Sequence, residues 1–220
     1  MAHADIEIVA ETGVQAPGEA AGVEFSTLRE PVIGGAGHVA FGAELSGPGI
    51  ITSTSSLSNN EVIFAGIPRS LRKVVQENDP APGTAPDVVF LNLPQRIGDH
   101  NRIAVSDSGD VAVYAVLRGP GIDAFNRNGV WAEIDGSLVL IARTGQLLPG
   151  GAMLAALTDF SLTDAGVTLF VNADPGGREI WLYRGGALEL IAAEGDPAPG
   201  FADCTFGQLF RPVASPSGKL

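Results

Sequence analysis

Few residues of this chain have the types and spacing that chemistry needs. Asp99 and His100 stand side by side in the segment "RIGDHNR", and the other two histidines are isolated. No Ser-His-Asp or His-x-His spacing surrounds them, and solvation in a loop explains this pair as well as catalysis does. We therefore predict no catalytic residue, and we expect Asp99 and His100 to contact a ligand.

A second polar segment, "DAFNRN", follows a Gly-Pro-Gly corner. Asp123, Asn126 and Asn128 offer oxygen atoms of the kind that Ca²⁺ prefers, but only one of them is charged. We therefore expect no metal site and no cofactor, with Ca²⁺ at this loop as the alternative. Together with an exposed aromatic, Phe125, the same residues fit a sugar or a protein surface, and they equally fit an inert solvated loop. Ile50–Asn60 occupies the equivalent place and should emerge on the same side.

The other reactive side chains form no site in the sequence. Glu11, Glu77 and Glu194 are scattered around strand ends, and Arg143 stands there in the third unit, so a paired-carboxylate glycosidase has no support. Cys204 is the single cysteine, which excludes an internal disulfide and a cysteine-based metal site.

Composition defines the class of protein that must position these residues. Of 220 residues, 45% are hydrophobic and 17% are charged, which indicates a folded domain. The 29 glycines and 15 prolines, with β-branched runs between them, predict an all-β fold. A formal charge of -12 argues against nucleic acid as a partner. No apolar run reaches the about 18 residues of a membrane span, and no signal peptide is visible in this chain.

Pro-Gly pairs recur at fixed spacing and define the units. Twelve residues before each anchor glycine an aliphatic run begins, and five residues before it stands a residue type that tolerates positive φ. We expect four equivalent strands and four structural corners. The anchors are Gly18, Gly83, Gly150 and Gly200; the runs begin at Ile6, Leu71, Leu138 and Leu188; the positive-φ positions are Gly13, Asn78, Gly145 and Gly195.

The repeated "ENDPAPG" and "EGDPAPG" belong to these corners. Proline fixes φ, Pro-Gly suits a type II turn, and Asp79 and Asp196 can accept backbone N–H bonds. The other two corners keep Pro-Gly and lose the carboxylate, so we interpret the segment as structural.

A second motif joins two strands in each unit: a small or polar residue, a glycine three residues later, and an apolar residue four residues after that. Its copies are Gly34/Gly37/Phe41, Ser106/Gly109/Val113, Thr163/Gly166/Phe170 and Ser215/Gly218. Trp131 and Trp181 recur at one position of the unit, which indicates core packing. No polar residue recurs at an inward strand position.

The unit is thus four strands followed by a corner. Its copies are 19–83, 84–150 and 151–200, with 1–18 as the last strand of a preceding unit and 201–220 as the start of a further one. We expect a β-propeller-like array, an incomplete propeller of about three blades with an unpaired strand at each end. The remaining units or self-association would close it. A sandwich of merged units and a solenoid are the alternatives.

The pattern Gly-x-Val-Ala-Phe, then Leu-x-Gly-Pro-Gly, an aromatic strand and "LELIAAEGDPAPG" resembles bacterial tandem-repeat proteins with an NxxGxxxF repeat. The match is best at 37–49, 109–121 and 188–200. The resemblance implies a secreted or surface-anchored protein, a propeller-like β fold and no established activity. The asparagine of that repeat is replaced here by Gly34, Ser106, Thr163 and Ser215, and the third unit has "NADPGG" in place of Gly-Pro-Gly.

Two functions remain open at this point. We favour a noncatalytic repeat module with a binding or structural function, which contacts a protein or glycan surface through loops of one face. The alternative is a hydrolase or lyase that acts on polysaccharide or ester in the central channel of a propeller.

Overall fold

The computed structural model describes residues 6–52, 58–93, 96–97 and 100–212. Strands form the regular structure of that part, and its one helical turn is the 3-10 turn η1 (Gly35–Gly37). The predicted all-β class is confirmed. Within the described ranges, no helix is long and apolar enough to cross a membrane.

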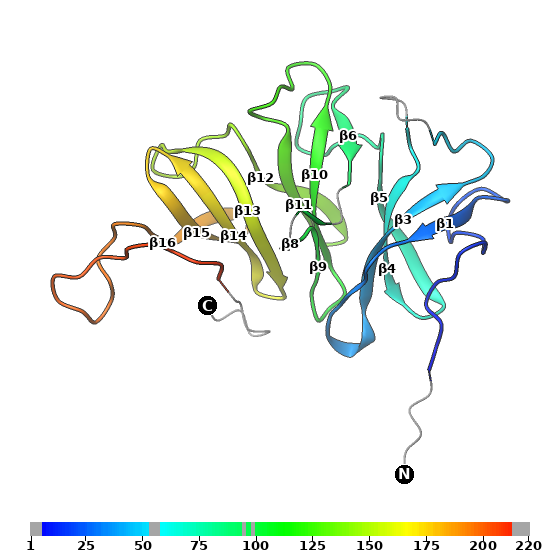
Figure 1. The fold of residues 1–220 in the computed structure, drawn as a ribbon, viewed down its shortest axis with the longest axis horizontal. Coiled ribbons are helices and arrows are strands. Elements are labelled where there is room, and N and C mark those ends of the chain that lie inside the picture. Colours follow the sequence, from blue (N-terminus) through cyan, green and yellow to red (C-terminus); the bar gives the residue numbers. More distant parts are fainter. Residues whose placement is uncertain (1–5, 53–57, 94–95, 98–99, 213–220) are drawn as a thin grey trace, which may run out of the picture.

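Three large antiparallel sheets stand side by side along the molecule (Figure 1). The first has the order β1-β3-β4-β5 with β2 beside β3: β1 (Glu24–Leu28), β2 (Val32–Ile33), β3 (Val39–Ser46), β4 (Glu61–Ile67) and β5 (Ser70–Gln76). The second has the order β12-β11-β10-β6 with β9 beside β10: β6 (Val89–Asn92), β9 (Ile103–Val105), β10 (Val111–Arg118), β11 (Asn128–Ile134) and β12 (Ser137–Arg143). The third has the order β13-β14-β15-β16: β13 (Met153–Thr163), β14 (Gly166–Asp174), β15 (Gly177–Arg184) and β16 (Ala187–Ala193). A small hairpin of β7 (Arg96–Ile97) and β8 (His100–Asn101) lies between β6 and β9 in the chain.

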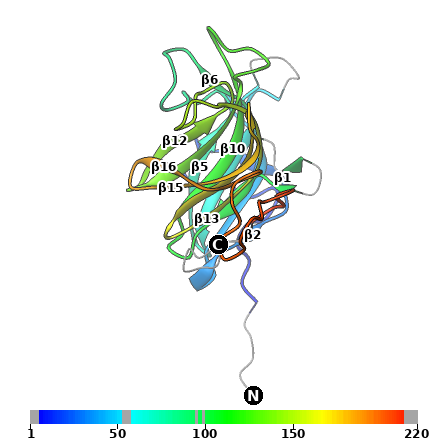
Figure 2. The same cartoon turned by 90° about the vertical axis from the view of Figure 1, so that its left-hand side faces the viewer.

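The second sheet is buried on both faces. Val113 packs with Ile63 of the first sheet, whereas Tyr114 packs with Leu169 of the third. Successive residues of a strand point to opposite faces, so one apolar strand serves two interfaces. Each fully buried aliphatic side chain contributes about 1.5–3 kcal/mol, and these interfaces therefore hold the three sheets in chain order. The view turned by 90° shows the sheets one behind another (Figure 2).

Aromatic side chains at one position of the unit fill the core, as predicted. Phe64, Trp131 and Trp181 are 0%, 0% and 2% exposed. In the first two sheets they face the apolar residues of the second motif, Phe41 and Val113.

The third copy of the second motif is offset by one residue from the first two. Trp181 faces Leu169, and Phe170 points to the other side of the sheet. The reason is the turn between β13 and β14, where Thr163 pairs directly with Gly166. This turn has two residues, fewer than the turn between β9 and β10. The shorter turn shifts the residues of β14 by one position relative to β15.

The predicted strand that opens at Ile6 is wrong. Residues 6–10 form no strand, and Ile6 and Ile8 are 97% and 69% exposed. β5, β12 and β16 are each hydrogen-bonded to the strand before them, and the described residues offer no such partner to 6–10. Three of the four expected outer strands therefore exist in the described part.

Each of three corners is hydrogen-bonded to the chain segment that follows it, which in the first two cases is the first strand of the next sheet. Asn78 N–H donates to Phe90 O, Gly145 N–H to Leu154 O, and Gly195 N–H to Phe206 O, each at 2.8 Å. The donors have φ of 71°, 80° and 92°, as their residue types predicted. The glycines at the anchor positions also have positive φ: Gly18, Gly83, Gly150 and Gly200.

The acidic side chains of the corners cap backbone. Asp79 Oδ2 accepts from Gln76 N–H at 2.8 Å, and Asp196 Oδ2 accepts from Ala193 N–H at 3.1 Å. Gln146 does the same for Arg143 N–H at 3.0 Å in the corner that lacks a carboxylate. The shared function of the three side chains is therefore to accept one backbone N–H bond.

The turns at the opposite end of the sheets also contact one another. Asp107 Oδ1 accepts from Gly35 N–H at 2.8 Å, and Asp164 Oδ1 accepts from Ser108 N–H at 3.1 Å. The bonds from Ser108 lower the pKa of Asp164. Each sheet thus caps the turn of the sheet before it.

Candidate functional site

The loop between β10 and β11 contains three of the predicted site residues, and Asn128 begins β11. Asp123 Oδ1 accepts from the N–H groups of Phe125 and Asn126 at 2.8 and 3.2 Å. Asn126 Oδ1 accepts from Asp123 N–H at 2.9 Å, and its Nδ2 donates to Gly121 O at 2.9 Å. The polar side chains therefore order the loop itself.

Phe125 is the side chain that this ordered loop presents to solvent. It is 82% exposed. A large apolar ring on a loop fixed by hydrogen bonds can bind a surface with little loss of conformational entropy.

The loop between β3 and β4 is built in the same way where it is described. Asn59 Oδ1 accepts from Ile51 N–H at 2.7 Å, and Asn59 Nδ2 donates to Gly49 O at 3.2 Å. Gly49 and Gly121 are the last residues of equivalent Gly-Pro-Gly corners. Asn59 and Asn126 therefore make the same hydrogen bond, from Nδ2 to the carbonyl oxygen of that glycine. Both loops follow equivalent strands and leave the same end of the sheets.

The remaining predicted residues lie elsewhere. Asn128 occupies the first position of β11, where its backbone pairs with Thr144. Asp99 lies outside the described residues, and so does the side chain of His100. The β7–β8 hairpin leaves the second sheet between β6 and β9, halfway along its inner edge. The structure therefore does not group this insertion with the β10–β11 loop.

A row of charged residues at one position of the unit was not predicted from the sequence. Glu30, Arg102, Asp159 and Arg211 each stand seven residues before the glycine of the second motif. Pairing confirms that two of them are equivalent, because Arg102 O accepts from Tyr114 N–H and Asp159 faces Phe170 at the matching place. The statement that no polar residue recurs at an inward position is therefore wrong, and the charges alternate in sign along the row.

The row is ion-paired and deeply buried at its centre. Arg211 forms an ion pair with Asp159, and Arg102 and Asp159 are 5% and 3% exposed. The Arg102 guanidinium lies 4.2 Å from the centre of the Tyr114 ring, a cation–π contact. Burial lowers the pKa of Arg102, against the opposing influence of Tyr114 and Asp159. Arg102 Nε and Nη1 have no hydrogen-bond partner in the part of the chain that the structure describes.

Glu77 and Glu194 also share one position, contrary to the sequence interpretation. Their backbone N–H groups donate to Glu61 O and Arg178 O, as Thr144 N–H donates to Asn128 O. Arg143 precedes that position by one residue, and Thr144 occupies it in the second sheet. The two carboxylates belong to corners at opposite ends of the array, so they do not form a paired-carboxylate site. Across the described ranges, no group of three or more His, Cys, Asp or Glu side chains is placed to hold a metal ion.

Comparison with family models gives a match that covers most of the chain. A family model described as "Family of unknown function (DUF7453)" matches residues 2–177. This chain belongs to that family. No curated protein and no solved structure matches it significantly.

The DUF7453 match covers the first two sheets and ends at the start of β15. The β10–β11 loop, Arg102 and Asp159 fall inside the matched residues, whereas Arg211 follows them. Spacing from the motif glycine would have revealed the charged row of this DUF7453 member. The charges of these side chains differ in sign, however, and the shared position becomes evident only from the pairing of the strands.

Proposed function

We propose that this DUF7453 chain is a noncatalytic, propeller-like repeat module that binds glycan through the loops at one end of its sheets. The closed form of the array remains part of the proposal. The described sheets support it, because β9 contacts both β2 and β13, so the innermost strands of neighbouring sheets lie together. The corner and turn hydrogen bonds repeat from sheet to sheet, as the blades of a propeller require.

Phe125 is the observation on which the binding proposal rests. Its ring is exposed on a loop that hydrogen bonds hold in one shape, with Asn126 and Arg127 beside it. Aromatic faces stack on the apolar faces of sugar rings, and amide and guanidinium groups bind sugar hydroxyls. A protein surface is the other ligand that this chemistry would suit.

A retention assay on insoluble polysaccharides tests the proposal. The chain, its Phe125→Ala variant and a Phe201→Ala control are incubated with cellulose, chitin, insoluble xylan and starch granules. Phe201 is 70% exposed on a different corner, so Phe201→Ala also removes one exposed aromatic ring but leaves the β10–β11 loop unchanged. We expect retention of the parent chain on at least one polysaccharide and a loss of about tenfold for Phe125→Ala only, the value of one aromatic contact of about 1.4 kcal/mol.

Absence of retention on every polysaccharide would refute glycan binding, and equal losses in the two variants would refute the role of the loop. Thermal melting of both variants should match the parent chain, since each ring is mostly in solvent.

The enzyme alternative draws on a different observation, the buried Asp159 on an inner strand. A hydrolase or lyase would use this carboxylate in the channel. Turnover of polysaccharide or ester substrates that Asp159→Asn abolishes and Phe125→Ala preserves would replace the binding proposal.

We also place the module outside the cell or on its surface, on the resemblance to secreted tandem-repeat proteins alone. Detection of the native protein only in the cytosolic fraction would overturn that placement.

A further inference from the structure

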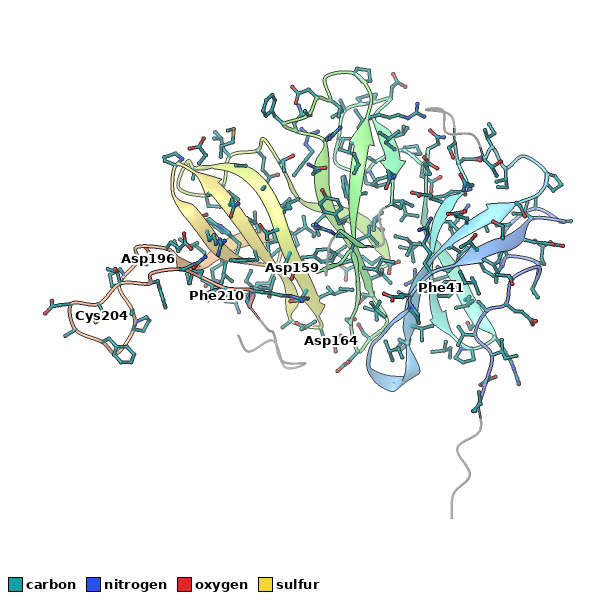
Figure 3. The ribbon with its side chains drawn as sticks, viewed as in Figure 1. Phe41, Asp159, Asp164, Asp196, Cys204 and Phe210 are labelled. Atoms are coloured by element: carbon teal, nitrogen blue, oxygen red, sulfur yellow. The ribbon has the colours of Figure 1, made fainter. Side chains whose placement is uncertain are left out.

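The third sheet carries a pocket on the face that points away from the second sheet. It has a volume of about 190 Å³ and lies between β13, β14 and the C-terminal segment. Figure 3 shows Asp159 beside this segment, which also bears Phe210. Its lining residues are Asp159, Phe160, Ser161, Thr168, Phe170, Arg211 and Pro212.

Two neighbouring cross-strand pairs form the floor of the pocket. Ser161 faces Thr168, and Asp159 faces Phe170. These positions alternate with Leu169, which packs toward the second sheet, so all four side chains share the outward face. The β-ladder therefore fixes a carboxylate, two hydroxyls and an aromatic ring next to one another.

The charged group of the pocket is held in place. Asp159 is 3% exposed, its Oδ1 accepts from Phe160 N–H at 2.8 Å, and its carboxylate pairs with Arg211. Arg211 is half-exposed and forms the rim. A fixed acceptor and a donor fork thus stand on two sides of the same space.

The Thr168 hydroxyl points to a ligand. Thr168 is 3% exposed and lines the pocket, yet its hydroxyl makes no hydrogen bond with any residue that the structure describes. The Ser161 hydroxyl opposite has none either within the same ranges. Both hydroxyls therefore line the pocket without a partner among the described residues, and a bound molecule that carries hydroxyl groups can hydrogen-bond to each of them.

We propose that this pocket binds a single sugar residue or a small cyclic polyol. Ligand hydroxyls can donate to Asp159, accept from Arg211 and pair with Thr168 and Ser161, while a ring face packs on Phe170. At about 30 Å³ per water molecule, the volume corresponds to about six waters. Pockets for drug-sized ligands begin at about 300 Å³, so one ring fits here and an oligosaccharide does not.

Other small ligands suit the lining less well. A phosphate or carboxylate would pair with Arg211 but would lie against the charge of Asp159. An apolar molecule would cover Phe170 and leave both hydroxyls unsatisfied.

This pocket is separate from the β10–β11 loop and goes beyond the proposed function; it lies on the face that a closed array would pack against a further unit, so the inference applies to the array in its open form. It lies on strands of the third sheet, whereas Phe125 lies on a loop of the second. Phe125→Ala should therefore leave sugar binding at the pocket unchanged.

Binding of soluble monosaccharides to the 220-residue chain tests the inference. Calorimetry or NMR titration uses glucose, galactose, mannose, xylose and inositol, with sodium phosphate and acetate as anionic probes. We expect at least one sugar or inositol to bind, and Thr168→Val to weaken it about three- to tenfold, the value of one hydrogen bond. Thr158→Val is the matched control, because Thr158 lies on β13 outside the pocket and should bind as the parent chain does.

Ser161→Ala provides a second test if Thr168→Val does not fold, since Ser161 is less buried. Three results would overturn the inference: no sugar or polyol binds, anions bind in preference to sugars, or both hydroxyl variants bind like the parent chain.

Discussion

Two corners of this chain have nearly the same sequence and different surroundings. "ENDPAPG" follows β5, and "EGDPAPG" follows β16. In both, the aspartate accepts a backbone N–H three residues earlier, and the second residue has positive φ. The backbone of the motif is thus determined locally, by proline, glycine and one short acceptor.

The glutamates that open the two corners differ because their neighbours differ. Glu77 is 8% exposed and lies beside Glu61, whereas Glu194 lies beside Arg178. Burial, together with the charge of Glu61, raises the pKa of Glu77. Hydrogen bonds from Leu209 and Arg178 N–H lower the pKa of Glu194. One residue type at one position therefore acquires opposite electrostatics from another strand.

The corners also differ in what they pack against. Pro82 O of the first corner accepts from Trp131 Nε1 of the second sheet at 3.0 Å. A Cβ on Gly83 would lie 2.9 Å from Leu140 Cβ, whereas a Cβ on Gly200 would meet nothing within 4 Å. The first corner is therefore an interface between sheets, and the described neighbours leave the last one open.

Valine at the two anchor glycines should separate these environments most strongly. Both glycines have positive φ, of 77° and 83°, where a β-branched residue costs about 1–3 kcal/mol. Gly83→Val adds overpacking against Leu140, for a total loss of about 3–5 kcal/mol. Gly200→Val should lose about 1–3 kcal/mol. Urea denaturation of the two variants measures the difference, and equal losses would show that the packing of the first corner contributes nothing.

The sequence predicts the repeated elements better than the contacts between them. Trp131 and Trp181 could be assigned to the core because their spacing recurs, and Asp79 because an Asx turn is local. The pairing of Leu169, and not Phe170, with Trp181 depends on the length of the turn between β13 and β14. The Arg102–Asp159–Arg211 row depends on which inner strands meet, a long-range fact that residue types alone do not specify. Loop residues Asp123 and Asn126 were recognised as polar, but their use in ordering the loop depends on backbone geometry.

Glu77→Gln should stabilise the protein at neutral pH. The substitution keeps the shape and removes a buried charge whose Oε2 has no hydrogen-bond partner in the described part of the chain. Because the folded pKa of Glu77 is raised above the ordinary 4.5, its contribution to stability is present below pH 4.5 and is lost as pH rises through the folded pKa. We expect a gain of about 1 kcal/mol at pH 7 that disappears near pH 4. Thermal melts at both pH values measure it, and an equal gain at each would contradict the electrostatic cause.

Glu194→Gln should lower the stability of the protein at neutral pH, in contrast to Glu77→Gln, and its effect should be the smallest of those expected here. The folded pKa of Glu194 is lowered below 4.5, so its carboxylate contributes stability above pH 4.5 that is lost as pH falls through the folded pKa. Because the group is exposed, solvent screens this contribution. Glu194→Gln should therefore melt slightly below the parent chain at pH 7 and together with it in acid. Thermal melts at both pH values detect the change, and a stabilised Glu194→Gln at neutral pH would show that the two corners share their electrostatics after all. If both glutamine variants follow their expected signs, the identity of the cross-strand neighbour, Glu61 or Arg178, determines what a repeated acidic motif does to stability.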